Sequence, residues 1–86
     1  MPVKQDTAAD RIRDLLKKEF PSDTVDVTPS GIRDNLHVVV MSRKFDRMRH
    51  KKRQDYVWAL LHGSDLTEEE LSRVSMILPL SPDDVR

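Results

Sequence analysis

The first part of the chain changes from a helical to an alternating pattern of apolar positions. Over residues 7–20 the apolar side chains recur three and four positions apart, the period of one helix face. They are Ile12, Leu15, Leu16 and Phe20. Pro21 ends this predicted helix, because proline lacks the N–H that another turn needs. Alternation over residues 24–28 then predicts a strand with one solvated face, followed by a turn at 29–31.

The middle of the chain predicts a second strand and a second helix. Residues 36–41 form an unbroken apolar run, which indicates a strand in mid-sheet or one buried on both faces. We expect residues 42–48 to be irregular, with Phe45 and Met48 turned inward. A helix is predicted over residues 49–62, and Gly63 is a suitable residue to end it. Its inner face comprises Tyr56, Val57, Leu60 and Leu61.

The last part of the chain predicts a short helix and a third strand. Residues 67–70 read Thr-Glu-Glu-Glu, a capping box in which the first and last residues satisfy each other's backbone donors. The helix that follows is expected to pack through Leu71 and Val74. Residues 75–80 form the last predicted strand, and Pro79 indicates that this strand lies at a sheet edge.

The predicted element order is therefore α-β-β-α-α-β, an α+β chain. Two helices between the second and third strands favour one helix layer packed on one side of a three-stranded sheet. A length of 86 residues predicts a single domain over residues 1–86, with a small core and no deep substrate cavity. We expect its ends, residues 1–6 and 81–86, to fray.

Composition narrows the location and the chemistry. The chain has no cysteine, which excludes a disulfide framework and a thiolate metal site. Residues 1–6 are polar and lack the apolar core of a signal peptide, and no segment approaches the ~20 apolar residues of a membrane span. We therefore expect a cytoplasmic protein that does not contact a membrane.

Basic residues are concentrated in one stretch of a chain whose formal net charge is zero. Residues 33–53 carry eight Lys/Arg against two acids, while residues 62–86 carry two against six. The densest part of the stretch, which we call the basic stripe, comprises Arg43, Lys44, Arg47, Arg49, Lys51, Lys52 and Arg53. Such a layout is typical of a solvated, charged helix face, and in some proteins it steers an anionic partner.

The same stretch resembles the BolA family, and most closely its shorter IbaG-like branch. In that family a strand ending in a small residue leads into Phe-x-Gly, then a basic residue followed by His or Gln, then an apolar helix face. The residues that carry the resemblance are Ser42, Phe45, Met48, Arg53, Gln54, Val57 and Leu60. Residues 81–84 resemble the family's closing Thr-Pro-x-Glu, whereas Arg47 stands where the family has Gly. The resemblance implies a mixed sheet in a BolA-like fold, a relative of the type II KH fold.

The resemblance also implies a partner, because BolA-like proteins bind monothiol glutaredoxins. The surface expected to face this partner comprises Phe45, Met48, Arg53, Gln54, Arg73 and Ser75. Arg53 and Gln54 also have a structural interpretation, in which Arg53 donates hydrogen bonds to the preceding loop. The implied role is that of a non-enzymatic accessory protein in iron–sulfur and redox homeostasis, monomeric or weakly dimeric.

With its glutaredoxin a BolA-like protein can share a [2Fe–2S] cluster, to which it lends a His at the start of the last strand. That position is Arg73 by gapless counting, or Ser75 if the strand is two residues shorter. Neither residue is a usual iron ligand, since cluster iron is held by Cys or His. We therefore expect no cofactor on the chain alone and no cluster ligand from these positions.

An alternative is a nucleic-acid-binding transcriptional regulator that uses the basic stripe. Several of its residues precede or open a helix, which is where KH-like and helix-turn-helix domains approach a phosphate backbone. The Gly-x-x-Gly loop by which KH domains clamp RNA is absent, and Trp58 is the aromatic residue left for base stacking. Strong salt dependence of DNA binding would favour this alternative.

Residues suited to catalysis are few. There is no Gly-rich phosphate loop and no nucleophile motif, and the carboxylates of residues 68–70 have the simple interpretation of a solvated first helical turn. His50 and His62 have no regular metal-ligand spacing and are expected on exposed helix ends. His37 is a weak candidate metal ligand, and hydrogen bonding within a strand is its more economical role. We expect a protein that is not an enzyme.

Overall fold

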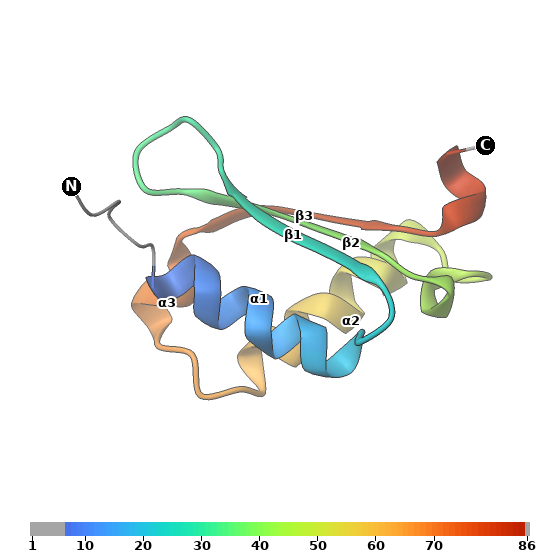
Figure 1. Cartoon of the computed structure of the whole chain (residues 1–86), viewed down its shortest axis with the longest axis horizontal. Helices are drawn as coiled ribbons and strands as arrows, with labels where there is room; N and C mark the ends of the chain where they lie inside the picture. The colour runs from blue at the N-terminus through green and yellow to red at the C-terminus, as the bar shows by residue number, and fades with distance from the viewer. Residues whose placement is uncertain (1–6, 86) are drawn as a thin grey trace.

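The computed structural model describes residues 7–85, which form one helical layer and one sheet (Figure 1). In chain order the elements are α1 (Thr7–Glu19), β1 (Thr24–Pro29), β2 (Leu36–Met41), the 3-10 helix η1 (Arg43–Phe45), α2 (His50–His62), α3 (Glu68–Ser72), β3 (Val74–Leu80) and the 3-10 helix η2 (Pro82–Val85). This order confirms the predicted α+β arrangement. None of the described helices is long and apolar enough to cross a bilayer.

The three strands form a mixed sheet in the order β1-β2-β3. β1 and β2 are antiparallel, with Val27 opposite Val38, and β2 and β3 are parallel, with Val38 opposite Ile77. The parallel pair is connected by the helices α2 and α3, which provide the long crossover that such a pair requires. The prediction that β2 lies in mid-sheet and β3 at an edge is confirmed.

The core lies between the sheet and the helices. Side chains alternate along β2, so that Leu36, Val38 and Val40 are buried under the helices while their neighbours face the other way. α1 presents the apolar face predicted from its three- and four-residue spacing. The largest fully buried apolar side chains are Phe20, Phe45, Ile12, Leu16, Leu36, Leu61, Val38, Val40 and Val57.

Three local predictions need correction. Val74 is a buried residue of β3 and not a packing residue of α3, which ends at Ser72. Helix α2 begins at His50, because Arg49 has extended backbone angles and serves as its N-cap. Residues 42–48, expected to be irregular, include the regular turn η1, whose N-terminal residue Ser42 accepts a hydrogen bond from the N–H of Lys44.

The tail, which was expected to fray over residues 81–86, has regular structure in the part that the structure describes. Residues 82–85 form η2, and Ser81 is only 2% exposed. The N–H of Ser81 donates to the carboxylate of Asp84, and its hydroxyl donates to the carboxylate of Asp46. These contacts across the fold order a segment whose sequence shows no periodic pattern. Residues 1–6 and 86, also expected to fray, lie outside the described residues.

Candidate functional site

The residues predicted to face a partner are spread along the sheet. Arg73 and Ser75 flank the start of β3, which is level with the start of β2 because the two strands are parallel. Residues 42–49 follow the other end of β2 along the chain, whereas Gln54 on α2 contacts the middle of β3 through the carbonyl of Ile77. A six-residue strand spans about 20 Å, which one protein interface of ordinary size can still cover. We call residues 30–37 with 73–76 the loop end, and residues 43–53 with η2 the basic end.

Phe45 is a core residue at the basic end. Its ring is fully buried, 5.6 Å from the ring centre of Phe20 and 6.1 Å from that of Tyr56. Met48 is half-buried against the same core, as the prediction of inward-facing side chains requires. Phe45 therefore positions the partner-binding candidates around it and offers no surface of its own.

Arg53 and Gln54 attach α2 to the edge strand β3. The Nε of Arg53 donates to the carbonyl of Met48 at 2.9 Å, and its guanidinium reaches the carboxylate of Asp84 and the carbonyl of Pro79. The Nε2 of Gln54 donates to the carbonyl of Ile77 at 2.6 Å. Both side chains thus have the structural role that was one of their two interpretations, and the β3 carbonyls that they occupy are not free to pair with another strand.

Most cations of the basic stripe are engaged within the fold. The Nζ of Lys44 donates to the main-chain carbonyl of Glu19 at 2.7 Å and lies 5.0 Å from the ring centre of Phe20. Arg43 pairs with Asp46 at 3.2 Å, and Lys51 pairs with Asp55 at 3.0 Å. Together with Arg53, four of the seven candidates thus have a partner within the fold, although the side chains of Arg43 and Lys51 stay exposed in their surface ion pairs.

Three cations of the stripe remain without a partner among residues 7–85: Arg47, Arg49 and Lys52. All three are exposed and surround the start of α2, whose N-cap makes no side-chain hydrogen bond. Arg47 has a φ of 67°, in the left-handed region that only glycine adopts without strain. This explains why the resembling family has Gly at this position, and it means that Arg47 retains its side chain at a cost in backbone strain.

A shallow hollow adjoins these free cations. It has a volume of about 490 Å³ and is lined by Met48, Lys52, Asp55 and Tyr56. The hydroxyl of Tyr56 donates to Glu19 at 2.7 Å, and this bond raises the pKa of Tyr56 and, together with Lys44, lowers the pKa of Glu19. The polar tip of Tyr56 is therefore held inside the fold while its ring borders the hollow.

The carboxylates at the basic end serve structure. The hydrogen bond from Ser81 holds the pKa of Asp46 below its usual range. The hydrogen bond from the guanidinium of Arg53 lowers the pKa of Asp84, and the hydrogen bond from the N–H of Ser81 lowers it further. Each carboxylate is thus kept charged by donors that connect the tail to α2 and η1. None has the raised pKa of a general acid.

The loop end carries the two most exposed large apolar side chains of the described residues. Ile32 is 67% exposed at the tip of the β1–β2 loop, and Met76 is 41% exposed on the sheet face that no described helix covers (Figure 1). Ser30 shapes the loop, since its N–H donates to the carbonyl of Asn35 and its hydroxyl accepts from the N–H of Ile32. Neither Ile32 nor Met76 was among the site residues predicted from the sequence. For Ile32, the sequence feature that could have indicated an exposed apolar contact is an isoleucine inside a turn.

Arg73 and Ser75 are both involved in the geometry of the loop end. The Nε of Arg73 donates to the carbonyl of Asp34 at 2.7 Å, and the carbonyl of Arg73 accepts from the N–H of Leu36. Ser75 is the extra residue of a β-bulge opposite Leu36 and His37, and its hydroxyl donates to the carbonyl of Leu36. The two positions at which the family would carry its His therefore hold the β1–β2 loop against β3.

The loop end lacks the usual cluster ligand of the resembling family. His37, the weak metal candidate, lies half-buried in β2 between Thr28 and Met76. No group of three or more His, Cys, Asp and Glu side chains that could hold a metal occurs among residues 7–85. A guanidinium and a hydroxyl stand at the two positions of the family ligand, and neither is a usual ligand of cluster iron.

Comparison with known proteins gives matches in structure alone. No family model and no curated protein matches the sequence. BolA1 from Arabidopsis thaliana superposes with a TM-score of 0.64 at 22% identity, over 93% of this chain and 98% of its own. A BolA-like protein from Rickettsia prowazekii, solved by NMR, superposes with a TM-score of 0.63 at 21% identity, over 94% of this chain and 97% of its own. The chain therefore has the BolA-like fold.

Proposed function

We propose that this chain is a non-enzymatic, BolA-like accessory protein in iron–sulfur and redox homeostasis, which binds a monothiol glutaredoxin through its loop end. The observation that carries the proposal is that residues implied in partner binding and exposed apolar side chains occur together at the loop end. Arg73 and Ser75 belong to the partner surface that the resemblance implies, and the loop end at those two residues presents the exposed apolar side chains Ile32 and Met76.

The form of the loop supports a docking role. Hydrogen bonds of Ser30 and Asn35 fix the turn that presents Ile32, so little conformational entropy is lost when a partner covers it. Burying an isoleucine side chain contributes about 1.5–3 kcal/mol. Arg33, exposed beside Ile32, adds a cation for an acidic rim on the partner.

A binding role also agrees with how the polar side chains are used. Asp46, Asp84 and Glu19 each accept hydrogen bonds that join separate elements, and their lowered pKa values suit permanent charges. Because Arg73 and Ser75 do not fit cluster iron, we propose docking without a ligand from these positions. The carbonyls occupied on β3 favour a monomer in the free state.

The variant Ile32→Asp should weaken binding of apo monothiol glutaredoxin by about 10–100-fold, as expected for loss of an apolar anchor at an interface centre. Isothermal titration calorimetry measures the dissociation constant. Ala59→Asp is the matched control, since Ala59 is an exposed apolar position on α2 far from the loop, and it should leave the affinity unchanged. Equal affinities of wild type and Ile32→Asp, or no binding by wild type, would contradict the proposal.

A second candidate function, nucleic-acid binding, is favoured by one observation at the basic end. Arg47, Arg49 and Lys52 are exposed and lack ion-pair partners among the described residues, and Arg47 retains its side chain at a strained φ. Three free cations around one helix start suit contact with a phosphate backbone, which is sequence-independent and falls with salt.

If these three cations contact phosphates, DNA affinity should fall about 40-fold between 50 and 200 mM salt, because the slope of the logarithmic plot is about −0.9 per contact. Changing Arg47, Arg49 and Lys52 to Glu should abolish binding to a 20-base-pair duplex in fluorescence anisotropy. The control is the same charge change at Arg13, Lys17 and Lys18 of α1. An equal loss of DNA affinity in both variants would mean that binding depends on overall charge, and it would contradict a binding site at the basic end.

A further inference from the structure

A hollow between α2 and α3 has no role in the functions considered above. Its volume is about 300 Å³, and it is lined by Trp58, His62, Glu68, Leu71 and Ser72. It lies on the helical layer, and Ser72 in its lining directly precedes Arg73 of the loop end. The buried residues of α2 that face the sheet are Val57 and Leu61, so Trp58 occupies another side of the helix.

The apolar wall of the hollow is formed by Trp58 and Leu71. Both side chains are half-buried and pack against the edge of the core. His62, one turn along α2, lies with its ring centre 5.7 Å from that of Trp58 and at 34° to it. Half-buried tryptophans are enriched among the residues that dominate protein interfaces, because they bury much area at little cost in entropy.

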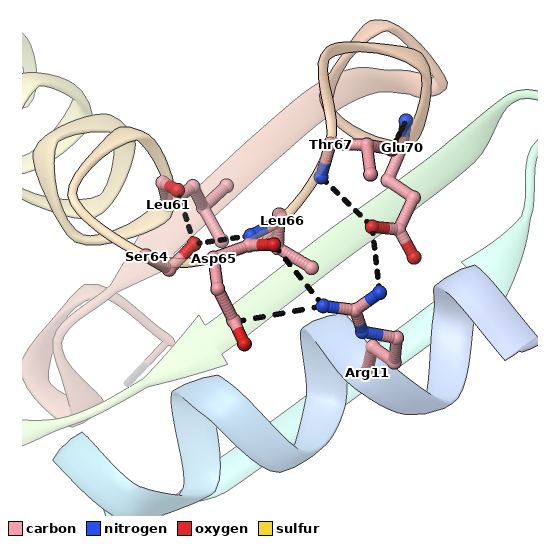
Figure 2. A network of polar contacts seen from close by, with 7 residues as sticks. All are labelled: Arg11, Leu61, Ser64, Asp65, Leu66, Thr67 and Glu70. Atoms are coloured by element: carbon pink, nitrogen blue, oxygen red, sulfur yellow. Dashed lines mark hydrogen bonds and ion pairs between the residues drawn. The ribbon is translucent and has the colours of Figure 1, made fainter.

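The carboxylates near the hollow divide into two groups. Glu70 and Asp65 are used within the fold: Glu70 accepts from the N–H of Thr67 and pairs with Arg11 at 3.1 Å, and Asp65 pairs with Arg11 at 3.5 Å (Figure 2). Glu68 and Glu69 have no ion pair with any of residues 7–85.

Glu68 lines the hollow, so a free negative charge stands at its rim beside an indole ring. Glu69, in the same first turn of α3, is a second carboxylate without an ion pair among residues 7–85. A cation over an indole face is attracted by its quadrupole, and the apolar stem of Lys or Arg packs well on aliphatic side chains.

We propose that this hollow docks a basic side chain of a partner protein segment. The cationic head pairs with Glu68 and lies over the Trp58 ring, while its stem and a neighbouring apolar residue pack on Leu71. The lining of this site shares no residue with the loop end or with the basic end. This site takes a positively charged ligand, whereas the basic end would take a negatively charged one.

The test uses the fluorescence of Trp58, the single tryptophan of the chain. The probes are a capped seven-residue peptide with two Arg and two Leu, and the same peptide with Glu in place of Arg. The Arg peptide should change the Trp58 emission in a saturable way, and the Glu peptide should not. Glu68→Gln should weaken binding of the Arg peptide about fivefold. Glu69→Gln makes the same charge change outside the lining and should leave the affinity unchanged.

Equal weakening by Glu68→Gln and Glu69→Gln would show diffuse charge attraction only and would overturn the proposal. So would an unchanged Trp58 emission with the Arg peptide, or an equal response to both peptides. Glutaredoxin affinity measured on Glu68→Gln separates the two proposals, because the loop end keeps its affinity in this variant whatever the peptide does.

Discussion

The variant Phe45→Ala should lose about 3–5 kcal/mol of its free energy of unfolding. The ring of Phe45 is fully buried between those of Phe20 and Tyr56, and it joins η1 to both α1 and α2. Its removal leaves a cavity where three elements meet. A chain of 86 residues has about 4–13 kcal/mol of stability in total, so the loss is a large fraction. Urea denaturation followed by circular dichroism measures it.

Two further variants make this result interpretable. Phe45→Leu keeps most of the volume and should cost only about 1 kcal/mol, which provides a measurable protein if Phe45→Ala does not fold. Ile32→Ala, at the exposed loop tip, should change stability by less than about 0.5 kcal/mol. A small effect of Phe45→Ala, or a large one of Ile32→Ala, would mean that core and surface are assigned wrongly.

Arg53→Met should be the second most damaging substitution, with a loss of about 2 kcal/mol. Methionine keeps the apolar stem, so the loss isolates the hydrogen bonds of the guanidinium to Met48, Pro79 and Asp84. Lys52→Met is the matched control, since the neighbouring Lys52 is exposed and unpaired among the described residues, and it should be neutral within about 0.5 kcal/mol. Chemical denaturation at neutral pH gives both values.

The effect of Arg53→Met should depend on pH. The hydrogen bond from Arg53 lowers the pKa of Asp84 from 3.8, so the folded state binds a proton at Asp84 less readily than the unfolded state does. The resulting stability is present above pH 3.8 and is lost as the pH falls through the lowered folded pKa. The difference between wild type and Arg53→Met should therefore become smaller in acid, while the part due to the carbonyls of Met48 and Pro79 remains. A difference that stays constant down to pH 2 would mean that the Asp84 contact contributes nothing.

The elements of this fold could be predicted because their signals are local. The spacing of Ile12, Leu16 and Phe20 defines α1, and the capping box of residues 67–70 is formed as expected. Pro79 predicts the edge position of β3 because proline cannot donate to a neighbouring strand. The BolA-like topology came from resemblance, since periodicity alone does not choose between layouts of the same elements.

The features that could not be predicted from the sequence depend on contacts between residues far apart along the chain. The tail is ordered by bonds of Ser81 to Asp46 and of Asp84 to Arg53, which span 35 and 31 positions. The basic stripe shows where the charge is concentrated but not which cations find acids, so the contacts of Lys44 with Glu19 and of Arg53 with Asp84 could not be predicted. The distance between Arg73 and Phe45 also depends on the three-dimensional arrangement of β3 and η1.

The most direct test of the proposed function is an amide-resolved NMR titration of the free protein with apo monothiol glutaredoxin. The proposal predicts saturable shifts in residues 30–37 and 73–76, with the amides of Arg47, Arg49 and Lys52 unmoved. Shifts centred on those three amides would move the contact to the basic end. A spectrum unchanged by a large excess of glutaredoxin would contradict the glutaredoxin partner altogether.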